Sequence, residues 1–236
     1  MGEGPYPCSV RLFKVGTMAL ADTPRLRVVE VFADVVCPFT HVGLRRLVSK
    51  RAELDRHDVA LWVRAWPLEL VNGEPLSAAL VAEEITALRE LVAPELFTGF
   101  DPDRFPSSSL PALALASSAY AHGVEVGEQV SLALRTALFE RGRDLADPAE
   151  VATIGQSFDL EYPGSAGEQS VLEDWNEGRR RGVLGSPQFF VEGEAFFCPT
   201  LTIAHVGDSL RVTLDQEGFD AFLASVFGDR RRNPGP

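Results

Sequence analysis

Apolar and polar residues alternate along the first third of the chain in a pattern that predicts two strands and a helix. The apolar runs 26–36 and 59–66 are rich in valine and leucine and predict buried β-strands. The amphipathic run 44–56 between them predicts a helix. A helix that joins two strands forms a βαβ unit, so the two strands are expected to lie parallel in one sheet.

The middle of the chain carries the spacing of helices and no strand signal. Asp147 is typical of a helix N-cap, and Pro148 after it suits the first helical position. Glu84 is expected to point outward together with the other acidic side chains of its helix. The predicted helices cover residues 77–91, 111–122, 126–141, a segment that starts after Asp147, and 164–181.

Strand signals return near the C-terminus. The runs 188–191 and 195–197 flank a Glu-Gly-Glu turn and predict a hairpin, and 216–227 predicts a last helix. Neither this ββα block nor the βαβ block contains a complete sheet, so we expect the two to share one. The prediction is an α/β fold with a long all-helical insertion. Its domains are a flexible extension (1–25), a sheet domain (26–76 and 182–229), the insertion (77–181) and a disordered tail (230–236).

Composition and charge exclude several classes of function. The chain has 236 residues and a net charge of -12, which argues against nucleic-acid binding because phosphate contacts require a basic surface. No apolar run approaches the length of a membrane span, about 18 residues. Three cysteines form no disulfide framework, and the four histidines lack the spacing of metal ligands. We therefore expect a cytoplasmic protein that binds no metal and no membrane.

Cys37 is the strongest candidate for chemistry. It lies where the first predicted strand ends and a helix begins, and Pro38 suits the first position of that helix. The helix dipole and the unpaired N–H groups at this end favour an anion. Thr40, three residues on, is expected to direct its hydroxyl and its N–H at the sulfur. The sequence thus predicts a thiolate with a lowered pKa.

Several neighbours of Cys37 have two interpretations each. His41 lies on the same helical face and is either a cation that favours the thiolate or a partly exposed neighbour. Asp34 either caps the strand end or relays protons, and Phe39 is expected to shape the mouth of the site. Cys198 is either a second thiol or a small buried apolar residue, and Cys8 belongs to the flexible extension.

Four segments stand out together: Asp34-Val35-Val36-Cys37-Pro38 with Gly43, Trp66-Pro67-Leu68, residues 138–147 and residues 182–191. With this order and spacing, the chain resembles the DsbA-like family. The resemblance is to its cytoplasmic branch, which includes the 2-hydroxychromene-2-carboxylate isomerases and the kappa-class glutathione transferases. It covers about residues 27–227 and implies a thioredoxin fold. It also implies a cis bond between Ser186 and Pro187, next to the thiol, which would leave the Ser186 backbone free to pair with an extended substrate.

The chain departs from the redox-active relatives at Thr40, where those carry a second cysteine. The leading hypothesis is a thiol-disulfide oxidoreductase with a single active-site thiol, in which Cys37 and Thr40 are catalytic. Its substrate would contact Pro38, Phe39, Ser186 and Pro187.

Two alternatives stay open: a glutathione-dependent isomerase or transferase, and a non-catalytic binding module. The expected partners are a thiol or disulfide substrate, or glutathione as co-substrate, with no covalently bound cofactor. A homodimer is compatible with the sequence.

Overall fold

The computed structural model describes residues 26–206 and 209–228. The predicted extension with Cys8 and the predicted tail lie outside the described residues.

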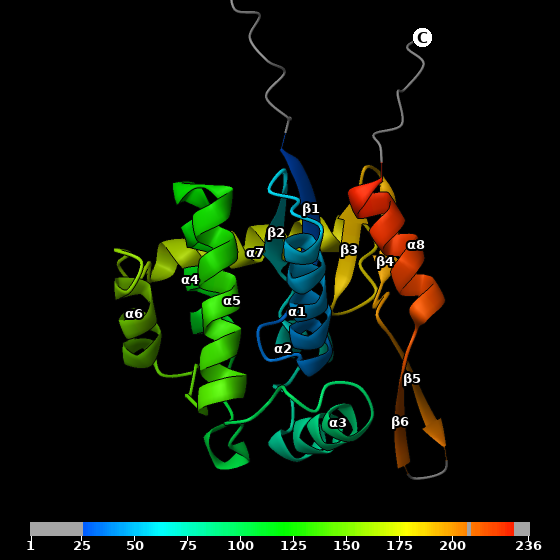
Figure 1. Ribbon diagram of the computed structural model, residues 1–236. Coiled ribbons are helices and arrows are strands. Elements are labelled where there is room, and N and C mark those ends of the chain that lie inside the picture. Colours follow the sequence, from blue (N-terminus) through cyan, green and yellow to red (C-terminus); the bar gives the residue numbers. More distant parts are fainter. Residues whose placement is uncertain (1–25, 207–208, 229–236) are drawn as a thin grey trace, which may run out of the picture.

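One mixed sheet joins the two ends of the chain. Its strand order is β2-β1-β3-β4, with β1 (Arg27–Ala33) parallel to β2 (Val59–Ala65). The strands β3 (Gln188–Val191) and β4 (Glu194–Phe197) add in antiparallel register on the other side of β1. Figure 1 shows this sheet at the centre of the molecule. The prediction that the βαβ and ββα blocks share a sheet is confirmed.

The predicted helices lie at or near their expected positions, and the structure adds a short helix at residues 68–72. The α1 helix begins six residues earlier than the apolar pattern indicated, because Pro38 starts it and the side chains of its first two turns are buried. The α-helices are α1 (Pro38–Glu53), α2 (Leu68–Asn72), α3 (Ala78–Leu91), α4 (Leu110–Ala119), α5 (Val124–Arg141), α6 (Pro148–Gln156), α7 (Ser165–Arg180) and α8 (Gln216–Phe227). None of the described helices is long and apolar enough to cross a membrane.

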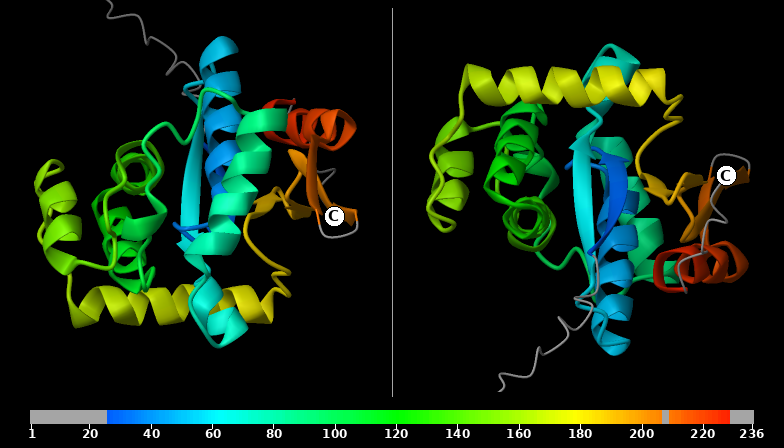
Figure 2. Two further views of the ribbon diagram at one scale, coloured as in Figure 1. Left: turned by 90° about the horizontal axis from the view of Figure 1, so that it is seen from below. Right: turned by 90° about the horizontal axis from the view of Figure 1, so that it is seen from above.

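Helices cover both faces of the sheet. Leu44 and Leu47 of α1 and Phe222 of α8 pack with buried residues of β1 to β3 on one face. On the other face Trp66 packs against Phe32 of β1, next to α7. The two views in Figure 2 show α7 and the pair α1 and α8 on opposite sides of the sheet. Burial on both faces explains why β1 reads as a nearly continuous apolar run.

The helical insertion covers the free edge of β2. The Tyr120 hydroxyl accepts a hydrogen bond from Val63 N (2.8 Å) and donates one to Leu61 O (3.2 Å). Carboxylates from α5 and α7 accept from two further backbone N–H groups: Glu128 from Leu61 N and Asp174 from Ala65 N. These side chains satisfy backbone groups that an edge strand would otherwise leave unpaired. The insertion thus helps to stabilise the sheet.

The structure adds a second hairpin that was not predicted. Strands β5 (Leu201–Val206) and β6 (Ser209–Leu214) pair in antiparallel register between β4 and α8. Apolar residues alternate along β6, as in Leu210 and Val212, so a strand signal was present. An isolated hairpin is only marginally stable, and this one is supported by contact of β6 with α3. That contact is not visible in the local sequence.

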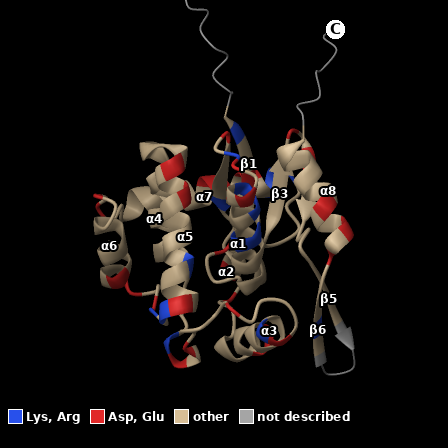
Figure 3. Ribbon diagram, viewed as in Figure 1, with Lys and Arg blue, Asp and Glu red and all other residues tan. Residues whose placement is uncertain are grey.

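Charge is unevenly distributed over the helices. The α8 helix carries Glu217 and Asp220 and no basic residue, whereas Arg45, Arg46 and Lys50 lie on α1 (Figure 3). The Arg46 guanidinium lies over the Phe219 ring, 5.0 Å from its centroid, and so links α1 to α8. Arg46 thus contributes to the packing of α1 against α8.

Candidate active site

Cys37 occupies the N-cap of α1, as predicted. Its backbone is extended (φ -79°, ψ 115°), and Pro38 fills the first helical position. The Cys37 carbonyl accepts the first helical hydrogen bond, from His41 N at 3.2 Å. The thiol therefore lies at the positive end of a 16-residue helix.

The bond between Ser186 and Pro187 is cis, which confirms the geometry that the resemblance implied. The Cys37 thiol donates to the Ser186 carbonyl, with 3.2 Å between sulfur and oxygen. The Ser186 hydroxyl accepts from Asp34 N (2.9 Å) and is 2.8 Å from the Thr40 hydroxyl. Four of the predicted site residues, which come from two distant parts of the chain, thus share one hydrogen-bond network.

The predicted direction of the Cys37 pKa is wrong. Burial raises the pKa of this thiol, because only 3% of the residue is exposed and a thiolate there loses its hydration. Hydrogen bonds from the Thr40 hydroxyl, from Ser186 and from Thr40 N lower the pKa but do not outweigh burial. The Thr40 donors are present as predicted. What the sequence could not show is that the helical insertion buries the sulfur.

Asp34 caps the end of β1. Its carboxylate accepts from Val36 N at 3.2 Å, from Leu68 N at 2.6 Å and from the Ser109 hydroxyl at 3.1 Å. The residue is fully buried, and burial raises its pKa to about 6 against these stabilising bonds. The capping interpretation is confirmed, and the raised pKa keeps a role in proton transfer open.

The raised pKa of Asp34 predicts a pH dependence of stability. The folded protein binds the proton of the Asp34 carboxyl more tightly than the unfolded chain does, because the ordinary pKa of this group is 3.8. The contribution of Asp34 is therefore most favourable below about pH 4 and is lost as pH rises through 6. Urea unfolding of wild type and of Asp34→Asn should be measured from pH 4 to 7. The difference between their free energies of unfolding should change by about 2–3 kcal/mol over this range. A difference that stays flat over this range would contradict the assignment.

Both predicted interpretations of His41, a cation that favours the thiolate and a partly exposed neighbour, are wrong. It is 1% exposed, and its Nε2 lies 2.8 Å from Glu140 Oε1. Burial lowers the pKa of His41 despite this carboxylate, so the ring is not the predicted cation. Glu140 also accepts from the backbone N–H of Phe97 and Thr98, both at 3.0 Å. His41 thus anchors the start of α1 to α5 and to the loop after α3.

Cys198 contacts the cis-proline through its backbone. Its N–H donates to the Pro187 carbonyl at 3.0 Å, one residue beyond the carbonyl that the Cys37 thiol contacts. Both cysteines are buried, unbridged members of one apolar cluster. Burial raises the pKa of Cys198 to about 12, with a smaller contribution from the charge of Cys37. At neutral pH Cys198 therefore remains a thiol. Phe39 is buried in the same cluster, and its role at the mouth of the site stays a prediction.

Sequence reasoning missed two charged residues. Glu84 was expected to point outward, but it is half-buried on α3, and burial raises its pKa to about 7. It approaches the site closely enough for its charge to raise the pKa of Cys37. Arg135 of α5 is buried beneath the active-site turn. The sequence does contain a signal for Arg135: a charged residue lies within one helical turn of the apolar residues Leu134 and Leu138, which belong to the buried face of the helix.

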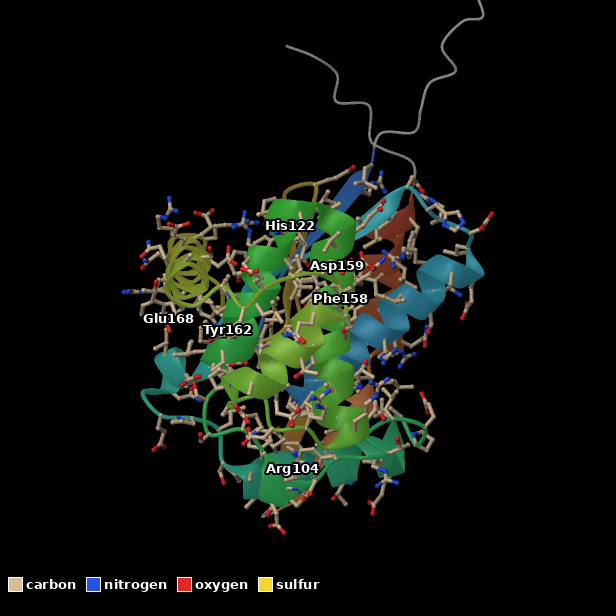
Figure 4. All side chains as sticks on the ribbon, turned by 90° about the vertical axis from the view of Figure 1, so that its left-hand side faces the viewer. Arg104, His122, Phe158, Asp159, Tyr162 and Glu168 are labelled. Carbon is tan, nitrogen blue, oxygen red and sulfur yellow. The ribbon has the colours of Figure 1, made fainter. Side chains whose placement is uncertain are left out.

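No group of metal ligands appears in the described part of the chain, where three or more His, Cys, Asp or Glu side chains never converge. Figure 4 shows His122 at one end of the helical insertion and Arg104 near the other.

A thiol at the N-terminus of a helix, opposite a cis-proline that immediately precedes a neighbouring strand, defines a thioredoxin-fold protein. Residues 28–206 match the family model of the DSBA-like thioredoxin domain. The chain belongs to this family, as the resemblance implied. No curated protein sequence matches it significantly.

Solved structures of low sequence identity share the fold. A probable DsbA oxidoreductase from Streptomyces coelicolor has a TM-score of 0.58 and 17% identity, over 87% of this chain and 92% of that one. A 2-hydroxychromene-2-carboxylate isomerase has a TM-score of 0.55 and 13% identity, over 72% and 88%. The cytosolic disulfide reductase DsbM from Pseudomonas aeruginosa, solved with GSH, has a TM-score of 0.51 and 18% identity, over 83% and 96%. At these identities the likeness describes the fold alone.

Proposed function

We propose that the protein is a thiol-disulfide oxidoreductase that acts through the single thiol of Cys37. The observation that carries the proposal is the contact of the Cys37 sulfur with the Ser186 carbonyl, beside Thr40 at the helix N-terminus. Membership of the DSBA-like family supports a thiol-dependent reaction. Thr40 occupies the position of the second cysteine of redox-active relatives, which limits this chain to one thiol in the turn.

The first step is a thiol–disulfide exchange. The Cys37 thiolate attacks one sulfur of a disulfide R–S–S–R′, forms a Cys37–S–S–R mixed disulfide and releases R′–S⁻. The departing thiolate takes a proton from solvent. Donors at Thr40 and the helix N-terminus stabilise the Cys37 anion before attack and again when it is the leaving group.

The second step requires a second thiol. We propose glutathione, whose thiolate attacks the R sulfur of the mixed disulfide, restores the Cys37 thiolate and leaves as R–S–S–glutathione. The net exchange converts one disulfide and one thiol into another disulfide and another thiol, so electrons balance. Cys198 is a poor alternative, because burial raises its pKa to about 12 and little thiolate is present at neutral pH. A structure of DsbM with GSH shows that glutathione binds at least one protein of this fold.

The substrate is proposed to bind along Ser186 and Pro187. Within residues 26–206 and 209–228 no hydrogen bond reaches Ser186 N, although its carbonyl and hydroxyl are both engaged. Leu184, beside this loop, is 75% exposed. The backbone carbonyl of an extended peptide or of glutathione could accept from Ser186 N, and Leu184 could contact an apolar side chain of a peptide substrate.

Peptide mapping after incubation with oxidised glutathione tests the function. We expect one glutathione adduct, on Cys37, that dithiothreitol removes. An unmodified Cys37, or an adduct confined to another cysteine, would rule the proposal out. Glutathione that binds reversibly without an adduct would instead favour the isomerase or transferase hypothesis.

A further inference from the structure

Arg135 is a buried cation that neither of the proposed steps uses. Only 1% of the residue is exposed, and by volume it ranks first among the fully buried side chains of the described part. A guanidinium in the interior loses its hydration, at a cost of several kcal/mol unless opposite charge and hydrogen bonds compensate. Its surroundings therefore indicate what it stabilises.

The hydrogen bonds of Arg135 fix its position but do not neutralise its charge. Nη1 donates to the Ser131 carbonyl (3.0 Å) and hydroxyl (2.6 Å), one turn earlier on α5. Nη2 donates to the carbonyl of Asp34 at 3.1 Å, at the start of the active-site turn. Nε has no partner among the described residues. All three acceptors are neutral, so the balancing anion must be a group that acts through space.

The ionisable groups around this cation come from the active-site turn, α1, the 3₁₀ segment before α5, and α3. The Asp34 carboxyl and the Cys37 thiol belong to the turn, His41 to α1, and Tyr120 to the 3₁₀ segment before α5. Glu84 of α3 approaches the site from the side of Cys37. Burial lowers the pKa of Arg135 to about 10, and the negative charges of Asp34, Tyr120 and Cys37 oppose that effect. Arg135 is thus a cation at neutral pH.

We infer that Arg135 is a positioning residue that holds the Asp34 carbonyl of the active-site turn and supplies the buried positive charge shared by the Cys37 thiolate and the Asp34 carboxylate. This role rests on the proposed function, and it adds a buried positive charge to the hydrogen bonds from Thr40 and Ser186 that lower the pKa of the Cys37 thiol. A positive charge fixed behind the turn favours the thiolate over the neutral thiol. Because two anions share one cation, ionisation of Asp34 is expected to disfavour ionisation of Cys37.

The pH dependence of Cys37 alkylation tests the inference. Iodoacetamide reacts with the thiolate, so the alkylation rate, read at Cys37 by peptide mass spectrometry, follows the ionised fraction. We expect Arg135→Met to raise the midpoint of this profile by about one pH unit or more. Arg135→Lys keeps the charge and should recover at least half of that shift. Arg143→Met removes an equal charge from the partner of Glu150 and should leave the midpoint unchanged.

A second variant keeps the test decisive if Arg135→Met does not fold. Asp34→Asn removes the competing anion and should lower the Cys37 midpoint, because the whole cation then favours the thiolate. Midpoints that stay within a few tenths of a unit in Asp34→Asn, or in a folded Arg135→Met, would overturn the inference. Alkylation requires no disulfide substrate, so this test is independent of the proposed function. Unchanged midpoints would overturn the role of Arg135 even if Cys37 forms mixed disulfides. Shifted midpoints would support that role even if Cys37 forms none.

Discussion

Replacing Cys37 with serine should abolish disulfide exchange. The serine hydroxyl fits the N-cap and can donate to the Ser186 carbonyl as the thiol does, so the fold should be kept. It cannot form a disulfide, however, and it is not ionised at neutral pH. We expect the rate of glutathione-dependent reduction of a small disulfide to fall at least about 1,000-fold, to the uncatalysed rate. The measurement is the coupled oxidation of NADPH by glutathione reductase.

Cys198→Ser is the matched control for that loss. Both cysteines are buried in the same cluster and both contact the cis-proline dipeptide through hydrogen bonds. The two substitutions therefore remove the same atom from neighbouring positions. If the second thiol comes from glutathione, Cys198→Ser should retain activity within about twofold. A comparable loss in Cys198→Ser would show that the chain supplies its own resolving thiol, and residual turnover in Cys37→Ser would place the chemistry elsewhere.

The fold was readable from the sequence because its signals are local and repeated. Valine-rich strands, Asp147 before Pro148, and the Glu-Gly-Glu turn each specify an element without reference to the rest of the chain. The pairing of β1 with β3 followed from the incomplete sheets of the two end blocks. The hairpin of β5 and β6 was missed, since its stability depends on packing against α3.

The composition of the site was readable, but its electrostatics were not. Asp34, Cys37, Thr40, Ser186 and Pro187 do come together, because the cis-proline loop precedes the strand that pairs with β1. The pKa of Cys37 was misjudged, since a helix N-terminus is a local feature whereas burial is imposed by distant helices. His41 was misjudged for the same reason, as its partner Glu140 is 99 residues away. Arg135 and Glu84 belong to the helical insertion, and neither lies in a segment that the resemblance to the family covers with a motif.

Thr40→Cys should convert the single-thiol site into a dithiol site. Thr40 is the third helical residue after the Cys37 N-cap, and helix geometry places Cα atoms three residues apart at about 5 Å. Disulfides usually join Cα atoms about 4.4–6.8 Å apart, so a bridge fits without rebuilding the turn. We expect mild oxidation to form a disulfide between Cys37 and the introduced cysteine, which peptide mapping of non-reduced protein would detect.

The consequence of that bridge is kinetic. In wild type the mixed disulfide at Cys37 persists until an external thiol attacks it, so its decay rate should rise in proportion to glutathione concentration. In Thr40→Cys the neighbouring thiol attacks the Cys37 sulfur and expels the substrate thiol. Decay should then be independent of glutathione and at least about a hundredfold faster at about 1 mM glutathione, because the attacking group is held in place. Thr40→Ser keeps the hydroxyl bonded to Ser186 and should decay as wild type does. Glutathione-dependent decay in Thr40→Cys would show that the cis-proline loop, rather than the missing cysteine, prevents internal release.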